Sequence, residues 1–128
     1  MYEAINPEVS IVTVTWKVKE LVLECIQSVY DKTQNYSFEI TVIDNDSKDG
    51  TAEAIEKKFP EIKLIKNNYN AGITVANNQG IKASKGQYIC FLNPDTHLIN
   101  NAIDLLVKYL EENSSVSAVG PKSINPGN

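Results

Sequence analysis

Residues 9–16 read Val-Ser-Ile-Val-Thr-Val-Thr-Trp, a run made almost entirely of strand-forming side chains. Nearly continuous β-branched residues are typical of a strand that is covered on both faces, as strands in parallel sheets are. Three further apolar runs follow at residues 38–43, 62–65 and 87–92, with a weaker one at 116–119. The opening run therefore predicts the first strand of a buried, mainly parallel sheet.

Helical patterns separate these runs. Apolar residues recur at helical spacing from Val18 to Val29, and residues 51–59, 71–84 and 99–110 carry further helix-like patterns. Strands that alternate with helices indicate an α/β fold, with a doubly wound parallel sheet between two layers of helices. We expect residues 1–128 to form a single three-layer domain. Its tail reads like a chain cut off within a loop, which indicates an incomplete domain.

Composition narrows the class of protein. The 128-residue chain has a net charge of −4, which argues against a nucleic-acid binder, because such proteins carry a basic surface. Residues 1–7 lack the basic and apolar regions of a signal peptide, and no apolar run is long enough for a transmembrane segment. Cys25 and Cys90 fit two buried thiols better than a disulfide. We expect a cytoplasmic protein.

The polar residues of interest follow the predicted strands. In a parallel α/β sheet, ligands bind in the crevice beyond the carboxyl ends of the strands. Here those ends carry residues 15–17, 44–51, 67–72 and 93–96, which are polar and turn-forming. We expect the loops that hold Trp16, Asp44, Asn70 and Asp95 to meet around one pocket.

Several blocks of the chain resemble family-2 glycosyltransferases with the GT-A fold. They are residues 9–16, the Val-Ile-Asp-Asn-Asp-Ser-Lys-Asp-Gly-Thr segment at 42–51, Asn-Ala-Gly at 70–72 with Ala-Asn-Asn-Gln-Gly at 76–80, and residues 86–96. The Leu-Asn-Pro-Asp-Thr form at 92–96 is most similar to the rhamnosyltransferase-type branch. The resemblance implies hexosyl or rhamnosyl transfer, with inversion, from a UDP- or dTDP-activated donor to an acceptor hydroxyl, in cell-surface polysaccharide biosynthesis.

The resemblance also implies where the nucleotide binds. It places a nucleobase contact in the pair Asp44 and Asn45, because a carboxylate or amide oxygen can accept the imide N–H of uracil or thymine. Trp16 stands where the family usually has tyrosine and could stack on the base; a core or partner-facing tryptophan is the alternative. The predicted nucleotide-binding residues are Thr15, Trp16, Asp44, Asn45, Asn70, Gly72 and Asn93. Ser47 and Asp49 are expected to shape the turn and cap the next helix.

Asn93-Pro94-Asp95 occupies the position of the family's Asp-x-Asp motif, with Asn93 in place of the first aspartate. The resemblance implies that Asp95 is a metal ligand for Mn²⁺ or Mg²⁺ bridging the donor phosphates. An ordinary turn, with Asp95 or Thr96 capping the following helix, is the alternative reading. His97 is expected to be a surface residue.

An inverting transferase needs a general base near the acceptor hydroxyl. By resemblance the family supplies it after the Asp-x-Asp region, whereas the last acidic residues here are Glu111 and Glu112. We therefore expect this chain to supply the donor site, to be inactive or weakly active alone, and to need a missing C-terminal portion that binds a glycan or lipid-linked acceptor. Such a protein would be peripheral at the inner face of the membrane.

Two other functions are compatible with an α/β sheet. A non-catalytic nucleotide-binding or regulatory module would use the same crevice without chemistry. A phospho-receiver domain would want an acidic pair after the first strand, where this chain has Thr15, Trp16 and Lys17.

Overall fold

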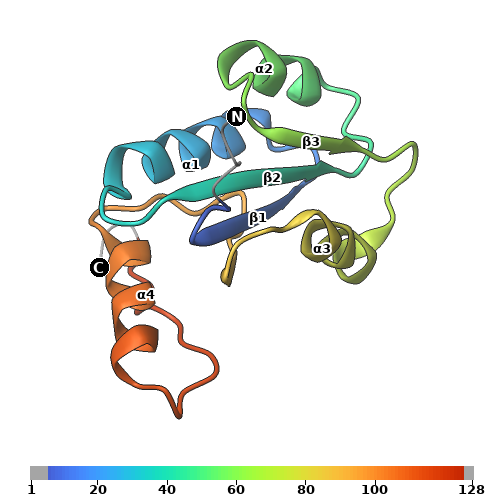
Figure 1. Ribbon diagram of the computed structural model, residues 1–128. Coiled ribbons are helices and arrows are strands. Elements are labelled where there is room, and N and C mark those ends of the chain that lie inside the picture. The colour runs from blue at the N-terminus through green and yellow to red at the C-terminus, as the bar shows by residue number, and fades with distance from the viewer. Residues whose placement is uncertain (1–5, 126–128) are drawn as a thin grey trace, which may run out of the picture.

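The computed structural model describes residues 6–125, in which strands and helices alternate along the chain (Figure 1). The elements are β1 (Val9–Thr15), α1 (Lys19–Lys32), β2 (Phe38–Asp44), α2 (Thr51–Lys58), β3 (Lys63–Lys66), α3 (Gly72–Ala83), β4 (Tyr88–Phe91) and α4 (Ala102–Glu112). The expectation about a signal peptide falls partly on residues 1–5, and that about a cut-off tail partly on 126–128, both outside the described residues. The predicted alternation is confirmed.

All four strands form one parallel sheet in the order β3-β2-β1-β4. β2 and β3 lie on one side of β1, and β4, the last strand in the sequence, lies on the other side. The strand order therefore reverses beside β1. In open α/β sheets this reversal, at the carboxyl ends of the strands, is where ligands bind.

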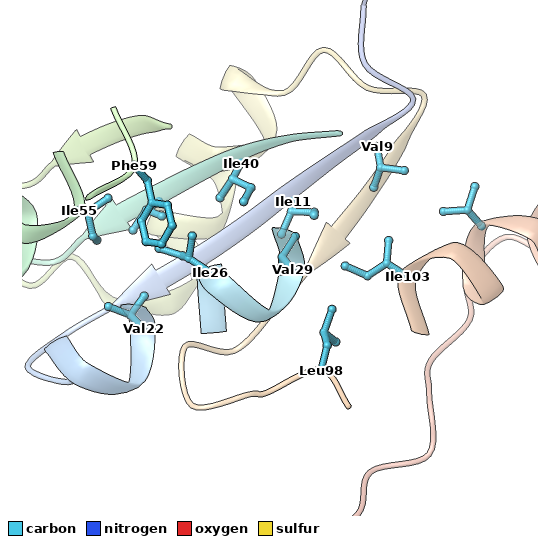
Figure 2. Packing of buried hydrophobic residues seen from close by; sticks show 12 residues of the cluster. Val9, Ile11, Val22, Ile26, Val29, Ile40, Ile55, Phe59, Leu98 and Ile103 are labelled. Atoms are coloured by element: carbon cyan, nitrogen blue, oxygen red, sulfur yellow. The ribbon is translucent and has the colours of Figure 1, made fainter. Parts of the chain in front are cut away.

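Helices cover both faces of the sheet, as Figure 1 shows. On one face, α1, α2 and α4 bury an apolar cluster against β1 and β2 (Figure 2), which includes Ile11, Ile26, Ile55 and Ile103. On the other face α3 packs on β1 and β2, where Ala76 meets Val12 and Ile43. The three-layer α/β prediction is confirmed.

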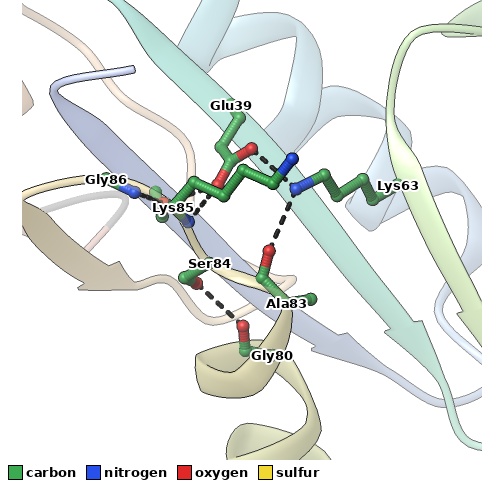
Figure 3. A network of polar contacts seen from close by, with 8 residues as sticks. Glu39, Lys63, Gly80, Ala83, Ser84, Lys85 and Gly86 are labelled. Atoms are coloured by element: carbon green, nitrogen blue, oxygen red, sulfur yellow. Dashed lines mark hydrogen bonds and ion pairs between the residues drawn. The ribbon is translucent and has the colours of Figure 1, made fainter. Parts of the chain in front are cut away.

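A polar network ties the amino ends of the strands together (Figure 3). The Glu39 carboxylate pairs with the Lys63 ammonium at 2.8 Å and accepts the Ser10 hydroxyl and the Lys85 N–H, each at 2.7 Å. Lys63 also donates to the Ala83 carbonyl at the end of α3 at 2.9 Å. Burial opposes ionisation of Glu39, but these bonds outweigh it and lower the pKa of its carboxyl. The polar side chains at the amino ends of the strands are therefore bonded to one another, which leaves the carboxyl ends for a ligand site.

The predicted fifth strand at residues 116–119 is wrong, because residues 113–125 form neither strand nor helix. Ser117 and Ala118 are exposed and only Val116 and Val119 are partly buried, so this short run buries too little apolar surface to add a strand at the free outer edge of β3 or β4. The fourth helix begins at Ala102, later than the predicted Ile99. Within residues 6–125, no helix combines the length and the apolar character that crossing a membrane requires.

Candidate functional site

A cleft of about 620 Å³ lies beyond the carboxyl ends of β1, β2 and β3. It is lined by residues of the three loops that follow these strands: Trp16, Lys17, Asp46, Ser47, Lys48, Asp49 and Asn70. Its volume is within the usual range for small-molecule sites, about 300–1,000 Å³. The cleft thus occupies the edge that the strand order favours for a ligand.

Several residues that line the cleft have a left-handed backbone conformation, with a positive φ angle. Lys17, Asp46 and Lys48 have φ angles of 55°, 63° and 57°, and they are the non-glycine residues with positive φ in the described chain. All three line the cleft. Non-glycine residues in this region cost about 1–3 kcal/mol each and cluster at functional sites. Asp46 and Lys48, which pair at 3.2 Å, are not among the predicted site residues, because such backbone angles are not visible in the sequence.

Ser47 joins the loops after β1 and β2. Its hydroxyl accepts the backbone N–H of Lys17 at 2.9 Å and donates to the carboxylate of Asp44. Asp44 and Ser47 are 6% and 2% exposed. The predicted base-contacting carboxylate therefore lies beneath the cleft, held by a serine on its lining.

Asp49 has the capping role expected from the sequence. Its carboxylate accepts the hydroxyl and, at 3.1 Å, the backbone N–H of Thr51, the first residue of α2. The hydroxyl contact is the main cause that lowers the pKa of Asp49.

Both the backbone and the side chain of Asn45 make hydrogen bonds within the protein. Its backbone N–H donates to the Thr15 carbonyl at 3.0 Å, its side-chain amide donates to the Gly72 carbonyl at 3.4 Å, and its side-chain oxygen accepts from Asn67 at 2.9 Å. The Gly72 N–H in turn donates to the Asn70 side chain at 3.0 Å. Asn45 and Gly72 thus hold the loops together, while Asn70 reaches the cleft lining.

Trp16 and Thr15 lie in opposite environments. The Trp16 ring is 48% exposed and lines the cleft, with the Lys17 ammonium 4.8 Å from its centroid, so it is not a core residue. Thr15 is 0% exposed, and its hydroxyl has no hydrogen-bond partner among residues 6–125. Of these two predicted nucleotide-binding residues, only Trp16 is accessible.

Asn93 and Asp95 do not line the cleft. β4 ends at Phe91, opposite Val12, whereas β1 continues to Thr15. Three more residues of strand place the end of β1 about 10 Å further along the sheet. The chain after β4 turns at once, with the Thr96 N–H donating to the Asn93 carbonyl at 3.1 Å.

Asp95 is exposed on this turn, next to α1. Burial, followed by the charge of Asp95, raises the pKa of the Cys25 thiol to about 12. In the described part of the chain, no group of three or more His, Cys, Asp or Glu side chains could hold a metal ion. His97 is exposed, as expected.

A family model described as glycosyl transferase family 2 matches residues 10–128. The chain belongs to this family.

Among curated relatives of this family-2 chain is the UDP-Glc:alpha-D-GlcNAc-diphosphoundecaprenol beta-1,3-glucosyltransferase WfaP of Escherichia coli. It is 33% identical over 80% of this chain and 41% of WfaP. The chain thus spans less than half of that relative's length. Another relative, the poly(ribitol-phosphate) beta-glucosyltransferase of Bacillus spizizenii, is 29% identical over 92% of this chain and 20% of its own length.

Solved structures confirm the GT-A fold. The mannosyltransferase PcManGT from Pyrobaculum calidifontis, in complex with GDP-Man and Mn²⁺, superposes with a TM-score of 0.73 at 22% identity, over 83% of this chain and 33% of that one. At such identity the likeness shows the fold alone. The family and the fold implied by the sequence resemblance are therefore confirmed.

Proposed function

We propose that this family-2 chain supplies the donor site of an inverting transferase that takes a sugar from a UDP- or dTDP-activated donor. The observation that carries the proposal is the cleft at the carboxyl edge of the sheet, which combines the exposed ring of Trp16 with the buried carboxylate of Asp44 below Ser47. A flat apolar face and an acceptor oxygen are what a pyrimidine base requires. Thr15 and Asn45 shape this site from below, Gly72 anchors the loop that carries Asn70, and Asn70 forms the rim.

Each of these groups has a distinct part in binding. A base stacked on Trp16 would gain about 1–3 kcal/mol, as in other aromatic–base contacts. The Asp44 carboxylate would accept the imide N–H of uracil or thymine. A cytosine ring lacks that donor, so its nucleotides would leave the carboxylate unpaired and bind more weakly.

We assign the divalent cation, Mn²⁺ or Mg²⁺, to Asp95 with Asn93 beside it. Asp95 is exposed, and the described residues offer it no ion pair or hydrogen bond. A single carboxylate fits such a cation, because phosphates and water can complete its shell, and the Asn93 amide beside it would bind the nucleotide. The bound cation would stabilise negative charge on the leaving diphosphate.

The acceptor site and the general base are proposed to lie outside residues 1–128, which we take as one domain that is weakly active or inactive alone. The partial coverage of WfaP supports this proposal. The name of WfaP favours a lipid-linked acceptor, and that of the Bacillus relative favours a cell-surface polymer. We further propose a cytoplasmic protein, peripheral at the inner face of the membrane, where it would meet a lipid-linked acceptor. The Leu-Asn-Pro-Asp-Thr segment favours the rhamnosyltransferase-type branch.

Calorimetric titration with UDP and dTDP, with and without Mn²⁺, tests the proposal. We expect metal-dependent binding that Asp95→Ala abolishes and that the matched control Glu24→Ala, which removes an exposed carboxylate on α1, retains. Equal binding of the nucleotides with and without Mn²⁺ would contradict the assignment of a metal ion to Asp95. No binding of either nucleotide would contradict the donor-site proposal itself.

A further inference from the structure

Two side-chain amides form a reciprocal pair between α3 and the loop after β3. The amide nitrogen of Asn67 donates to the oxygen of Gln79 at 2.9 Å, and the amide nitrogen of Gln79 donates to the oxygen of Asn67 at 2.9 Å. Each amide fixes the orientation of the other, because rotating either one would place nitrogen against nitrogen and oxygen against oxygen. The pair is therefore a rigid link between two elements.

The link continues to the loops of the cleft. The amide nitrogen of Asn67 also donates to the side-chain oxygen of Asn45 at 2.9 Å, and its backbone N–H donates to the Asp44 carbonyl at 2.9 Å. Asn45 passes the contact on to the Gly72 carbonyl. We call Gln79, Asn67 and Asn45 the amide relay.

The relay ends beside the exposed rim of the cleft. Gly72 has a φ of 80°, and its N–H is held by Asn70, which lines the cleft. Residues 68–70 are exposed, with Tyr69 at 62%, so little packing fixes this loop. The contacts of Asn45 and Asn67 are what hold it against the end of β2.

We propose that Asn67 and Gln79 are positioning residues for the nucleotide site. They do not line the cleft, but they hold Asp44, beneath the cleft, and Asn70, on its lining, in one arrangement before the ligand binds. Preorganisation of this kind raises affinity, because the loop does not have to be ordered at the moment of binding. The inference rests on the proposed function.

Two variants test the relay by UDP titration. Gln79→Leu removes both bonds of the pair, and Gln79→Glu keeps the shape and the acceptor but loses the donor to Asn67. We expect both to weaken UDP binding about threefold to tenfold, the value of one or two hydrogen bonds. The matched control is Gln87→Leu, which removes an exposed amide before β4 and should bind like the unmodified chain.

A second measurement separates positioning from loss of stability and does not need a nucleotide. In ¹H–¹⁵N spectra of the free protein, Gln79→Leu and Gln79→Glu should shift the backbone amide signals of Asn45 and Gly72, while both variants, though less stable than Gln87→Leu, stay fully folded at the temperature of the titration. Unchanged signals, or UDP affinities equal to the control's, would overturn the relay. If the unmodified chain bound neither UDP nor dTDP, the proposed function would fail, while the two amide signals would still decide whether the relay holds the loops.

Discussion

The Ser47 hydroxyl accepts the backbone N–H of Lys17 at 2.9 Å and so joins two loops that lie 30 residues apart in the chain. Lys17 has a positive φ, and the same hydroxyl donates to the buried Asp44 carboxylate. One small side chain therefore stabilises both a strained backbone and a buried charge on the floor of the cleft.

Ser47→Ala should destabilise the protein by about 1–3 kcal/mol, because the Lys17 N–H and the Asp44 carboxylate both lose their partner in a poorly solvated position. Urea unfolding measures the change. Ser117→Ala, at an exposed position after α4, is the matched control and should be neutral. Equal stability of the two variants would show that Ser47 does not hold the loops.

Gly80→Ala should destabilise the fold even though alanine is the better helix former. A Cβ at residue 80 would lie 2.2 Å from Cγ1 of Val12 on β1, so α3 would have to move away from the sheet. Overpacking of this kind costs about 1–3 kcal/mol. Gly120→Ala is the control, because a Cβ there meets nothing within 4 Å. A gain in stability from Gly80→Ala would contradict the close packing of α3.

Glu39→Gln should lower stability at neutral pH and flatten its acid dependence. The folded-state pKa of Glu39 is lowered from its ordinary value of 4.5, so its carboxylate stabilises the fold above that pH, and the stabilisation is lost as the pH falls through the folded pKa. Urea unfolding from pH 7 to pH 3 measures this. Glu112→Gln is the control, because its 3.9 Å pair with Lys108 is exposed. Parallel pH curves for Glu39→Gln and the unmodified chain would contradict the assignment.

Neither cysteine should react with a thiol reagent in the folded protein at pH 8. Burial is the largest cause that raises the thiol pKa, to about 12 at Cys25 and about 11 at Cys90, and only the thiolate is nucleophilic. Both thiols should label after unfolding in guanidinium. Labelling of either thiol in the native protein at the unfolded rate would contradict the burial.

The sequence predicts the sheet well because its strands are marked by local chemistry. The β-branched run at 9–16 identifies β1, and the apolar spacing from Val18 to Val29 identifies α1. The run from Val116 to Val119 looks similar over a shorter stretch, but pairing in a sheet depends on long-range packing against a sheet edge, which no local pattern records.

The site is predictable only in part, for the same reason. The positions of Trp16 and Asn70 on the cleft follow from the parallel strand order. The separation of Asp95 from that lining depends on how far β1 extends past β4, which is a matter of register. The amide relay depends on side-chain orientations that become fixed only when α3 packs on the sheet.

The signal of the Trp16 indole N–H in a ¹H–¹⁵N titration with UDP tests the central claim most directly, because the chain has a single tryptophan. We predict that UDP with Mg²⁺, which is diamagnetic, shifts the indole signal together with the backbone amides of Lys17, Ser47 and Asn70. Another hollow, between the end of α1 and the start of α4, is lined by Asp31, Asn35, Asn101 and Asp104. Shifts confined to these residues would contradict a nucleotide site in the cleft.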